Sequence, residues 1–527
     1  MKSATFLSGM LLPILLATIQ VGEVVGRIAF SDSVMNPLAA NAMSSKPPTV
    51  NFKPDLVASL NKCSGTSCSS SMNFSTPAAK AFEVGQQLPG IPFTLPNSWA
   101  GNLPVNKTTP DQQLWFWLWT SETATDTLTI WINGGPGCSS MIGAIAENGP
   151  FLYKDNERGP YRNPKSWTKL TNMLYVDQPI GVGYTVGKPE DRNEVDAARN
   201  FAGFLDNFYE AFPEMKGKKL FFTGESYAGL YLQFMAKYEY ERGNPHNLQG
   251  IMIVDGVLES DRDLQESVTA YDYATHFREL LALNDTDLAT IKAYSDAQNY
   301  TNYTADNLRY PLSGPLPPVA ADDQIITMRA LWNLSAAKYE DEDNFNLYNI
   351  GQRDSEPASI LSDGPDQSSV WFSSEEVKKA LHTSMNDTWY ECSEVFANST
   401  PIAPKDTPTL QGIIEQTNIT VLVHGMWDMR LLVNGTKLVV QDTEWRGKRG
   451  FQAPPTARFY DSDGVPAGKY QTERGLSLVT VDQAGHMVPG DAPSSAFALL
   501  KFLLGQGELG SPYGADSADK AKCKRST

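Results

Sequence analysis

Residues 224–229, with the sequence Gly-Glu-Ser-Tyr-Ala-Gly, are the part of this chain best suited to chemistry. They follow the short apolar run 220–223 and precede a segment with helical character. A serine on a sharp turn from strand to helix is held exposed, and the backbone N–H groups at the start of the helix can stabilise an oxyanion. The pattern therefore predicts that Ser226 is a nucleophile. It departs from the usual elbow at Ala228, where the general pattern has glycine.

In the α/β-hydrolase fold the partners of such a serine follow it along the chain, first an acid and then a histidine. His486 follows the β-rich run 476–481, and this fold carries its general base on a loop that leaves a strand. Asp428 follows another strand-like run, 420–423, where its carboxylate can fix the imidazole tautomer. The sequence thus predicts a catalytic triad of Ser226, Asp428 and His486.

The other four of the five histidines are interpreted as packing or surface residues. His424 adjoins an apolar strand-like run and is interpreted as a core histidine, and His246 lies in a polar loop. His276 and His382 lie on segments with helical character. No pair of cysteines or histidines has the spacing of metal ligands, so we expect neither a metal nor a cofactor.

With these residues in place, the chain resembles the serine carboxypeptidase family over about residues 75–505. Four further segments carry the resemblance and occur in the family's order. They are Trp-Ile-Asn-Gly-Gly-Pro-Gly-Cys-Ser-Ser at 131–140, Glu-Asn-Gly-Pro at 147–150, Tyr-Val-Asp-Gln-Pro at 175–179 and His-Met-Val-Pro at 486–489. The first of them is far more specific than the serine elbow. The run 431–436 is most similar to fungal secreted, carboxypeptidase S-like enzymes.

The resemblance implies a secreted enzyme that removes C-terminal residues from peptides and proteins at acidic pH, through an acyl-enzyme on Ser226. It assigns the oxyanion hole to the backbone N–H groups of Gly135 and Tyr227. It assigns recognition of the substrate's terminal carboxylate to Asn133, Gly134, Glu147 and Glu225. Two carboxyl groups that share a proton can donate a hydrogen bond to an anion, which explains glutamates at such a site.

The alternative is an acyltransferase, esterase or lyase on the same scaffold, because a fold does not determine its chemistry. The carboxylate-binding residues favour the exopeptidase, since an esterase has no need to recognise a free C-terminus.

Three positions depart from the family's pattern. Gln233 stands beyond the elbow where proline is common, and Met426 replaces the first aspartate of a Gly-Asp-x-Asp run before the catalytic acid. Asp255 replaces the asparagine of a Gly-Asn-Gly run. None of these changes removes a catalytic group, but each can alter the shape of the pocket and the rate.

Apolar runs at 128–132, 173–176, 220–222, 251–254, 420–423 and 476–481 read as strands, and helical patterning separates several of them, most clearly at 194–212. This alternation predicts an α/β fold with a mostly parallel central sheet, helices on both faces and a cap insertion. We expect a hydrolase core in two parts, 75–259 and 401–508, with the insertion at 260–400. A signal peptide at 1–20 with an uncertain cleavage site, an N-terminal segment at 21–74 that is open to processing, and a polar tail at 509–527 complete the chain.

The formal net charge of −17 makes nucleic acid and anionic membranes poor partners. No later segment reads as a membrane anchor, so peptide or protein C-termini are the expected partners and the oligomeric state stays open. We expect the protein to be secreted, with a vacuolar or other acidic compartment of the secretory pathway as the alternative. Ten sequons agree with this expectation: Asn73, Asn106, Asn284, Asn299, Asn302, Asn333, Asn386, Asn398, Asn418 and Asn434.

Five cysteines suit an oxidising compartment, although their number is odd. The family resemblance implies a disulfide between Cys138 and Cys392. The pairing of Cys63, Cys68 and Cys523 stays open.

Overall fold

The computed structural model describes residues 72, 74–153, 160–259, 262–322, 324–339, 345–352, 371–385 and 388–512. The predicted signal peptide and nearly all of the N-terminal segment and polar tail lie outside the described residues. So do Cys63, Cys68, Cys523 and the sequons at Asn73 and Asn386.

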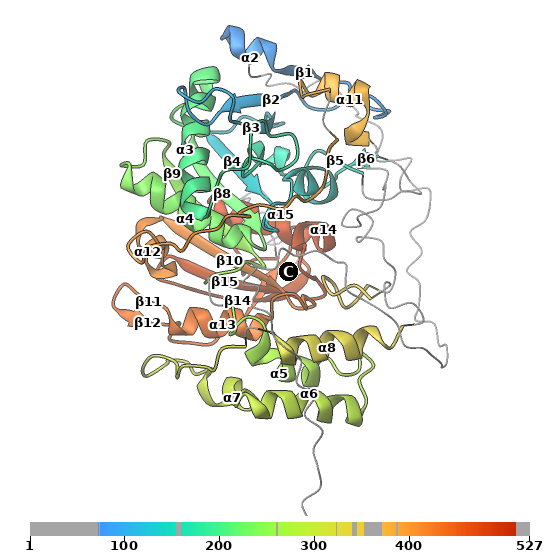
Figure 1. Ribbon diagram of the computed structural model, residues 1–527, viewed down its shortest axis with the longest axis vertical. Helices are drawn as coiled ribbons and strands as arrows, with labels where there is room; N and C mark the ends of the chain where they lie inside the picture. The colour runs from blue at the N-terminus through green and yellow to red at the C-terminus, as the bar shows by residue number, and fades with distance from the viewer. Residues whose placement is uncertain are drawn as a thin grey trace, which may run out of the picture. The chain divides into compact units, whose positions relative to one another are not determined.

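The centre of the described chain is an eleven-stranded sheet (Figure 1). In spatial order its strands are β1 (Glu83–Gly85), β2 (Ser98–Pro104), β3 (Gln113–Trp119), β7 (Asn172–Asp177), β4 (Thr127–Ile132), β8 (Lys219–Glu225), β9 (Leu248–Val254), β10 (Ile419–Gly425), β15 (Leu476–Val481), β14 (Pro466–Glu473) and β13 (Ala457–Tyr460). The middle strands, from β7 to β15, are parallel, and antiparallel strands flank them on both sides. The six apolar runs predicted as strands are these six parallel strands. Two small sheets pair β5 (Phe151–Leu152) with β6 (Tyr161–Arg162) and β11 (Glu444–Trp445) with β12 (Lys448–Arg449).

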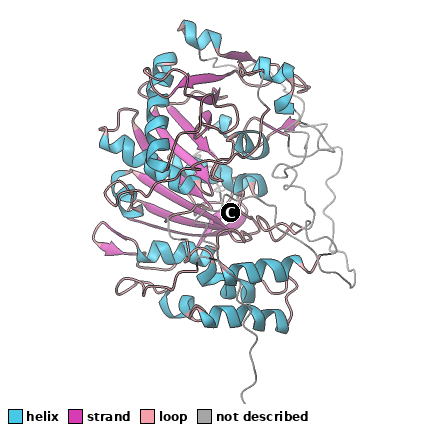
Figure 2. Cartoon of the chain, in the orientation of Figure 1, coloured by secondary structure: helices cyan, strands magenta, loops and turns pink. Residues whose placement is uncertain are grey.

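The parallel strands are apolar along their length because both faces of the sheet are covered, as Figure 2 shows. Side chains alternate between two hydrophobic cores: on β4, Ile130 and Ile132 enter one core and Trp131 enters the other. The first core packs against α3 (Glu194–Ala211), α4 (Ala228–Glu241) and α12 (Leu410–Gln416). The second packs against the π-helix η1 (Gly143–Glu147), α11 (Glu375–Ala380) and α15 (Pro493–Leu503).

The fold is therefore the predicted α/β fold with helices on both faces of its sheet. Helix α3 covers all but the last residue of the predicted helix 194–212, and the Asn193 side chain caps its first turn. The remaining helices are α2 (Pro77–Ala81), α5 (Ala270–His276), α6 (Asp285–Ala297), α7 (Tyr303–Asn307), α8 (Ile326–Ala336), α13 (Val433–Asp442) and α14 (Val488–Asp491), with short 3-10 turns at η2 (Trp167–Lys169), η3 (Pro213–Met215) and η4 (Ser267–Thr269). Among the described residues, no helix has the length and apolar character needed to cross a bilayer.

Two parts of the predicted insertion, helices α5, α6 and α8 and the segment 371–385, pack in different places (Figure 1). Helices α5, α6 and α8 share a hydrophobic cluster with Met429 and Leu432, from the loop that follows β10. Residues 371–385 pack elsewhere, near β2 and β3, where the Trp371 indole donates to the Pro89 carbonyl at 2.8 Å. One part of the insertion thus adjoins the loop of the predicted acid, and the other packs in the second core.

Candidate active site

Ser226 lies on the turn between β8 and α4 with a backbone φ of +60°, a conformation that residues other than glycine rarely adopt. Its N–H donates to the Val254 carbonyl at 3.0 Å, and its own carbonyl accepts the N–H of Gly229 at 2.9 Å. A Cβ on Gly229 would lie 2.4 Å from the carbonyl oxygen of Val257. The close approach in this elbow therefore requires glycine at Gly229, whereas Ala228 is accommodated in the core.

The strand order β8-β9-β10-β15 brings the carboxyl ends of these parallel strands to one edge of the sheet. Ser226 follows β8, Asp428 follows β10 and His486 follows β15. The three residues of the predicted triad therefore lie at the same edge.

Asp428 and His486 are in direct contact. Nδ1 of His486 lies 2.7 Å from Oδ2 of Asp428, and Oδ1 of Asp428 accepts the backbone N–H groups of Arg430 at 2.7 Å and Leu431 at 3.3 Å. Both side chains are buried. The carboxylate can thus hold one ring nitrogen of the imidazole and fix its tautomer.

His424 is buried and fully bonded, as expected of a core histidine. Its ring nitrogens lie 2.9 Å from a backbone carbonyl and 3.1 Å from the Thr436 hydroxyl. Burial lowers the pKa of His424 to about 4, so its ring is neutral at higher pH. His246 is more enclosed than a polar loop suggests, because its ring bridges the carboxylates of Glu239 and Asp206 at 2.9 and 3.0 Å.

The turn that follows β4 packs against the serine elbow. A Cβ on Gly134 would lie 2.4 Å from the backbone nitrogen of Tyr227 and 2.8 Å from Cβ of Ser226, so only glycine allows this approach. Gly135 comes next, with φ at +106°. The two residues assigned to the oxyanion hole, Gly135 and Tyr227, therefore belong to segments that touch each other beside Ser226.

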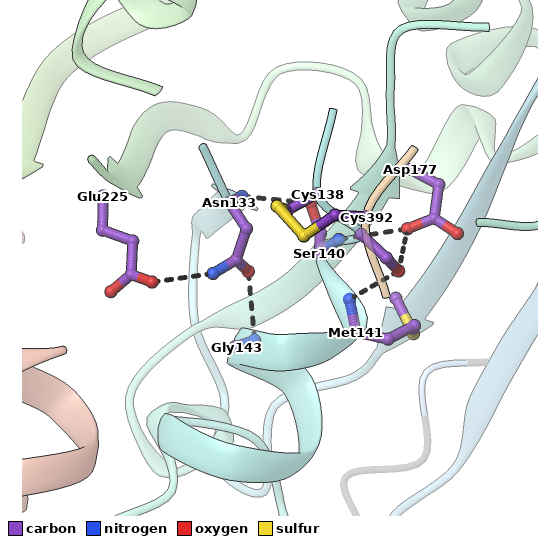
Figure 3. The surroundings of a disulfide bond; sticks show 9 residues. Asn133, Cys138, Ser140, Met141, Gly143, Asp177, Glu225 and Cys392 are labelled. Carbon is purple, nitrogen blue, oxygen red and sulfur yellow. Dashed lines mark hydrogen bonds between the residues drawn. A yellow bond between two sulfur atoms is a disulfide. The ribbon is translucent and has the colours of Figure 1, made fainter. Parts of the chain in front are cut away.

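A buried polar cluster adjoins this turn. The Asn133 amide nitrogen donates to Glu225 at 2.9 Å, and its oxygen accepts the N–H of Gly143 at 3.0 Å (Figure 3). Glu225 hydrogen bonds to Glu147 of η1. Burial raises the pKa of Glu225 well above its usual value, and the charge of Glu147 raises it further. Asn133, Glu147 and Glu225 thus form one connected group whose carboxyl pair is suited to sharing a proton.

Two constraints hold the turn that contains Gly134 and Gly135. Asp177, at the end of β7, accepts hydrogen bonds from the Ser139 hydroxyl at 2.6 Å and from a backbone N–H at 3.0 Å, and burial raises its pKa to about 6. A disulfide joins Cys138 to Cys392, 254 residues further along the chain (Figure 3). This is the pairing that the family resemblance implies.

The insertion helps to position His486. Its backbone N–H donates to the Tyr348 carbonyl at 2.7 Å, and the two rings meet edge to face with centroids 5.4 Å apart. A Cβ on Gly485 would lie 2.1 Å from the same carbonyl oxygen, so the loop fits closely against the insertion. No local signal in the sequence marks Tyr348, because its role depends on a contact between distant segments.

Asp255 is a further acid at this edge, which the sequence analysis noted only as a departure from the family's pattern. It follows β9 and is fully buried, and its Oδ1 accepts the N–H of Gly425 at 2.8 Å. An oxygen of Asp255, an oxygen of Asp428 and a ring nitrogen of His486 all lie within 4.8 Å of one another. The signal that could have marked Asp255 is its place directly after a predicted parallel strand, the same signal that marked Asp428.

Most sequons within the described residues are accessible. The exposed asparagines are Asn106, Asn284, Asn299, Asn302, Asn333, Asn398 and Asn418. Asn434 is only partly exposed, and its amide donates to Asp272 at 2.8 Å. Glycosylation at Asn434 would therefore have to break a hydrogen bond that the fold uses.

The profile of the serine carboxypeptidase family matches residues 89–506. The chain belongs to the serine carboxypeptidase family. It is 34% identical over 463 residues to a carboxypeptidase Y homolog of Arthroderma benhamiae, covering 84% of this chain and 90% of that protein. It is 30% identical over 466 residues to serine-type carboxypeptidase F of Aspergillus niger, covering 80% of this chain and 86% of that protein.

A solved structure shares the fold of this serine carboxypeptidase. It is that of Kex1(delta)p, a prohormone-processing carboxypeptidase from Saccharomyces cerevisiae, with a TM-score of 0.67 and 24% identity. The match covers 82% of this chain and 97% of that one. This likeness supports the α/β fold described above.

Proposed function

We propose that this serine carboxypeptidase releases C-terminal residues from peptides and proteins at acidic pH through an acyl-enzyme on Ser226. In this mechanism the Ser226 hydroxyl attacks the last peptide carbonyl while His486 takes its proton, and Asp428 stabilises the imidazolium through Nδ1. The backbone N–H groups of Gly135 and Tyr227 hold the oxyanion. His486 then protonates the leaving amine, and water releases the acyl group from the serine.

The observation that carries the proposal is the position of the buried group formed by Asn133, Glu147 and Glu225. Glu225 directly precedes Ser226 in the chain, and Asn133 directly precedes the glycine that packs against the elbow. Donors for a carboxylate therefore lie about one residue away from the nucleophile. In this proposal the buried group binds the carboxylate of the single residue that follows the scissile bond.

The acidic optimum follows from the carboxyl pair. Since burial and mutual repulsion raise the pKa of Glu225, the pair keeps a proton at acidic pH and can donate it to the substrate's carboxylate. When the pH rises through the titration of the pair, both carboxyl groups ionise and repel that carboxylate. His486 must be neutral to act as the general base. This requirement favours higher pH and so opposes the effect of the carboxyl pair.

We also propose that the enzyme works outside the cell or in an acidic compartment of the secretory pathway. The disulfide between Cys138 and Cys392 and the exposed sequons support an oxidising route. Vacuolar residence remains the alternative to secretion.

The test compares an N-blocked dipeptide with its C-terminal amide over a range of pH. We expect KM for the dipeptide to rise with pH while KM for the amide changes little, because the amide carries no charge for the ionised pair to repel. The double variant E147Q/E225Q should flatten the rise for the dipeptide, since glutamine donates at every pH. The same pH dependence of KM for both substrates would refute the carboxylate site and favour an esterase or acyltransferase.

A further inference from the structure

The acid of the proposed triad is one half of a buried carboxyl pair. Asp255 and Asp428 follow adjacent strands, β9 and β10, and neither has any exposed surface. Their carboxyl groups are within hydrogen-bonding reach of each other. Two ionised carboxylates so close together in a buried site would repel strongly, so one of them must carry a proton.

The hydrogen bonds around the pair show where that proton belongs. Asp428 accepts two backbone N–H groups and the Nδ1–H of His486, all of which stabilise a negative charge. Asp255 accepts one backbone N–H, from Gly425. Its other oxygen, Oδ2, is buried without a donor. The charge is therefore better stabilised on Asp428, and a proton on Asp255 Oδ2 would satisfy the atom that lacks a partner.

The remaining titratable groups around Asp255, among the described residues, include no lysine or arginine. They are Glu225, Tyr273, His424, His486 and Asp491. His424 lies 3.5 Å from Asp255, but its ring is neutral and its nitrogens are already bonded. Burial, followed by the charge of Asp428, raises the pKa of Asp255 well above its usual value, which agrees with the same assignment.

We propose that Asp255 is a positioning residue for catalysis: it stays protonated and donates a hydrogen bond to the Asp428 carboxylate, holding the acid in the orientation that His486 needs. This inference rests on the proposed function, because Asp428 matters to catalysis only if His486 is the base. The backbone of Asp255 has a φ of +42°, which aspartate and asparagine adopt more readily than most residues.

Two substitutions separate donation from packing. Asp255→Asn keeps the size, tolerates positive φ, accepts from Gly425 and donates to Asp428, so kcat should stay close to that of the parent. Asp255→Leu has a similar shape and cannot donate, and its Tm is compared with that of the parent because leucine tolerates a φ of +42° less well than asparagine. Its kcat for both the dipeptide and its amide should fall about tenfold or more, as expected for the loss of one hydrogen bond to a charged group, with little change in KM.

The matched controls are Asp191→Asn and Asp191→Leu. Asp191 is also a partly buried carboxyl group with one oxygen lacking a donor, and its pKa is raised to about 6, but it precedes α3, where its other oxygen accepts the Asn200 amide at 2.6 Å. Both control variants should keep the parent's kcat. An unchanged kcat in D255L, or an equal loss in D255N and D255L, would overturn the proposal.

The proton itself is tested without reference to activity. An infrared difference spectrum of the parent minus D255N should show the C=O stretch of a protonated carboxyl group at acidic and at neutral pH, and its absence would overturn the assignment. S226A and D428N are assayed alongside. If these two variants stay active, the proposed function fails, whereas the infrared band still reports on Asp255.

Discussion

Two histidines lie close to Asp428, and their surroundings differ. His424 lies 4.0 Å from the Asp428 carboxylate, but both of its nitrogens are bonded and its pKa is lowered to about 4 by burial. His486 lies 2.7 Å from the same carboxylate through Nδ1. In the proposed mechanism its Nε2 serves Ser226, a task that His424 has no nitrogen left to perform. The residue type alone does not distinguish them, whereas the loop position of His486 does.

Replacement of the nucleophile tests the triad most directly. Ser226→Ala should fold normally and lose activity by at least about 10⁴-fold, because the remaining groups cannot form an acyl-enzyme. Asp428→Asn should also fold and lose about 10⁴-fold in activity, since the imidazole of His486 would adopt the wrong tautomer. Peptidase assays and labelling with a serine-directed organophosphate measure both effects, with Ser494→Ala as the control. Labelling of the S226A variant would show that another serine reacts.

The turn that follows β4 is the element on which the site depends most. It contacts the serine elbow through Gly134, is hydrogen bonded to Asp177 through Ser139, and is joined to a distant segment through Cys138. Each contact comes from a different part of the chain. The position of the proposed oxyanion hole is thus a property of several elements packed together.

Gly134→Ala should separate this turn from the elbow. The added Cβ would lie 2.4 Å from a backbone nitrogen and 2.8 Å from a backbone oxygen, so the backbone must shift. We expect kcat/KM to fall by about 100-fold or more, the usual cost of losing one oxyanion donor. The matched control is Gly314→Ala, because a Cβ there has nothing within 4 Å and the backbone φ is not positive. Equal kinetics in the two variants would contradict the role of this contact.

The disulfide should matter more for stability than for chemistry. Beside the bond, the Ser393 N–H donates to the Gly137 carbonyl at 2.9 Å and the Ser139 N–H donates to Glu391 at 2.8 Å, so backbone pairing persists without it. The double variant C138S/C392S should lose about 2–5 kcal/mol of unfolding free energy and keep measurable activity below its Tm. Thermal unfolding monitored by circular dichroism checks the first expectation. An unchanged Tm would show that the backbone pairing alone holds the turn.

For the molecule as a whole, buried carboxyl groups predict greater stability in acid. Burial raises the pKa values of Asp177 and Asp191 to about 6, and those of Glu225, Asp255 and Glu266 are raised as well. A carboxyl group with a raised pKa holds its proton more tightly in the folded than in the unfolded chain. Its contribution to stability is therefore present at low pH and is lost as the pH rises from its unfolded pKa through its folded pKa.

His424 acts in the opposite direction, because its lowered pKa makes stability rise with pH between about 4 and 6.5. The raised carboxyl groups outnumber it, and the net charge of −17 adds repulsion at neutral pH. We expect Tm to be roughly 5 °C higher near pH 5 than near pH 8. Calorimetry across this range measures the trend. In the D177N variant the difference in Tm between the two pH values should be smaller than in the parent. A Tm that rises steadily with pH would contradict the balance.

Local sequence patterns were sufficient for much of this architecture. The six apolar runs are the six parallel strands, because a strand buried on both faces must be apolar along its length. The flanking strands β1, β2, β3, β13 and β14 were missed. In β14, which lies beside the edge strand β13, exposed and buried residues mix, and in β3 a continuous apolar run does not distinguish strand from helix.

The candidate site also has one part that the sequence predicts and another that only the tertiary structure determines. The types and order of Ser226, Asp428 and His486 follow from the chain, since each lies on the segment that leaves a recognisable strand. The pairing of Asp255 with Asp428 and the support of His486 by Tyr348 follow from the fold alone. These contacts join residues far apart in sequence, and they depend on the order of strands in the sheet and on where the insertion packs. Neither property leaves a periodic signal along the chain, because both arise from burying side chains of separate elements against one another.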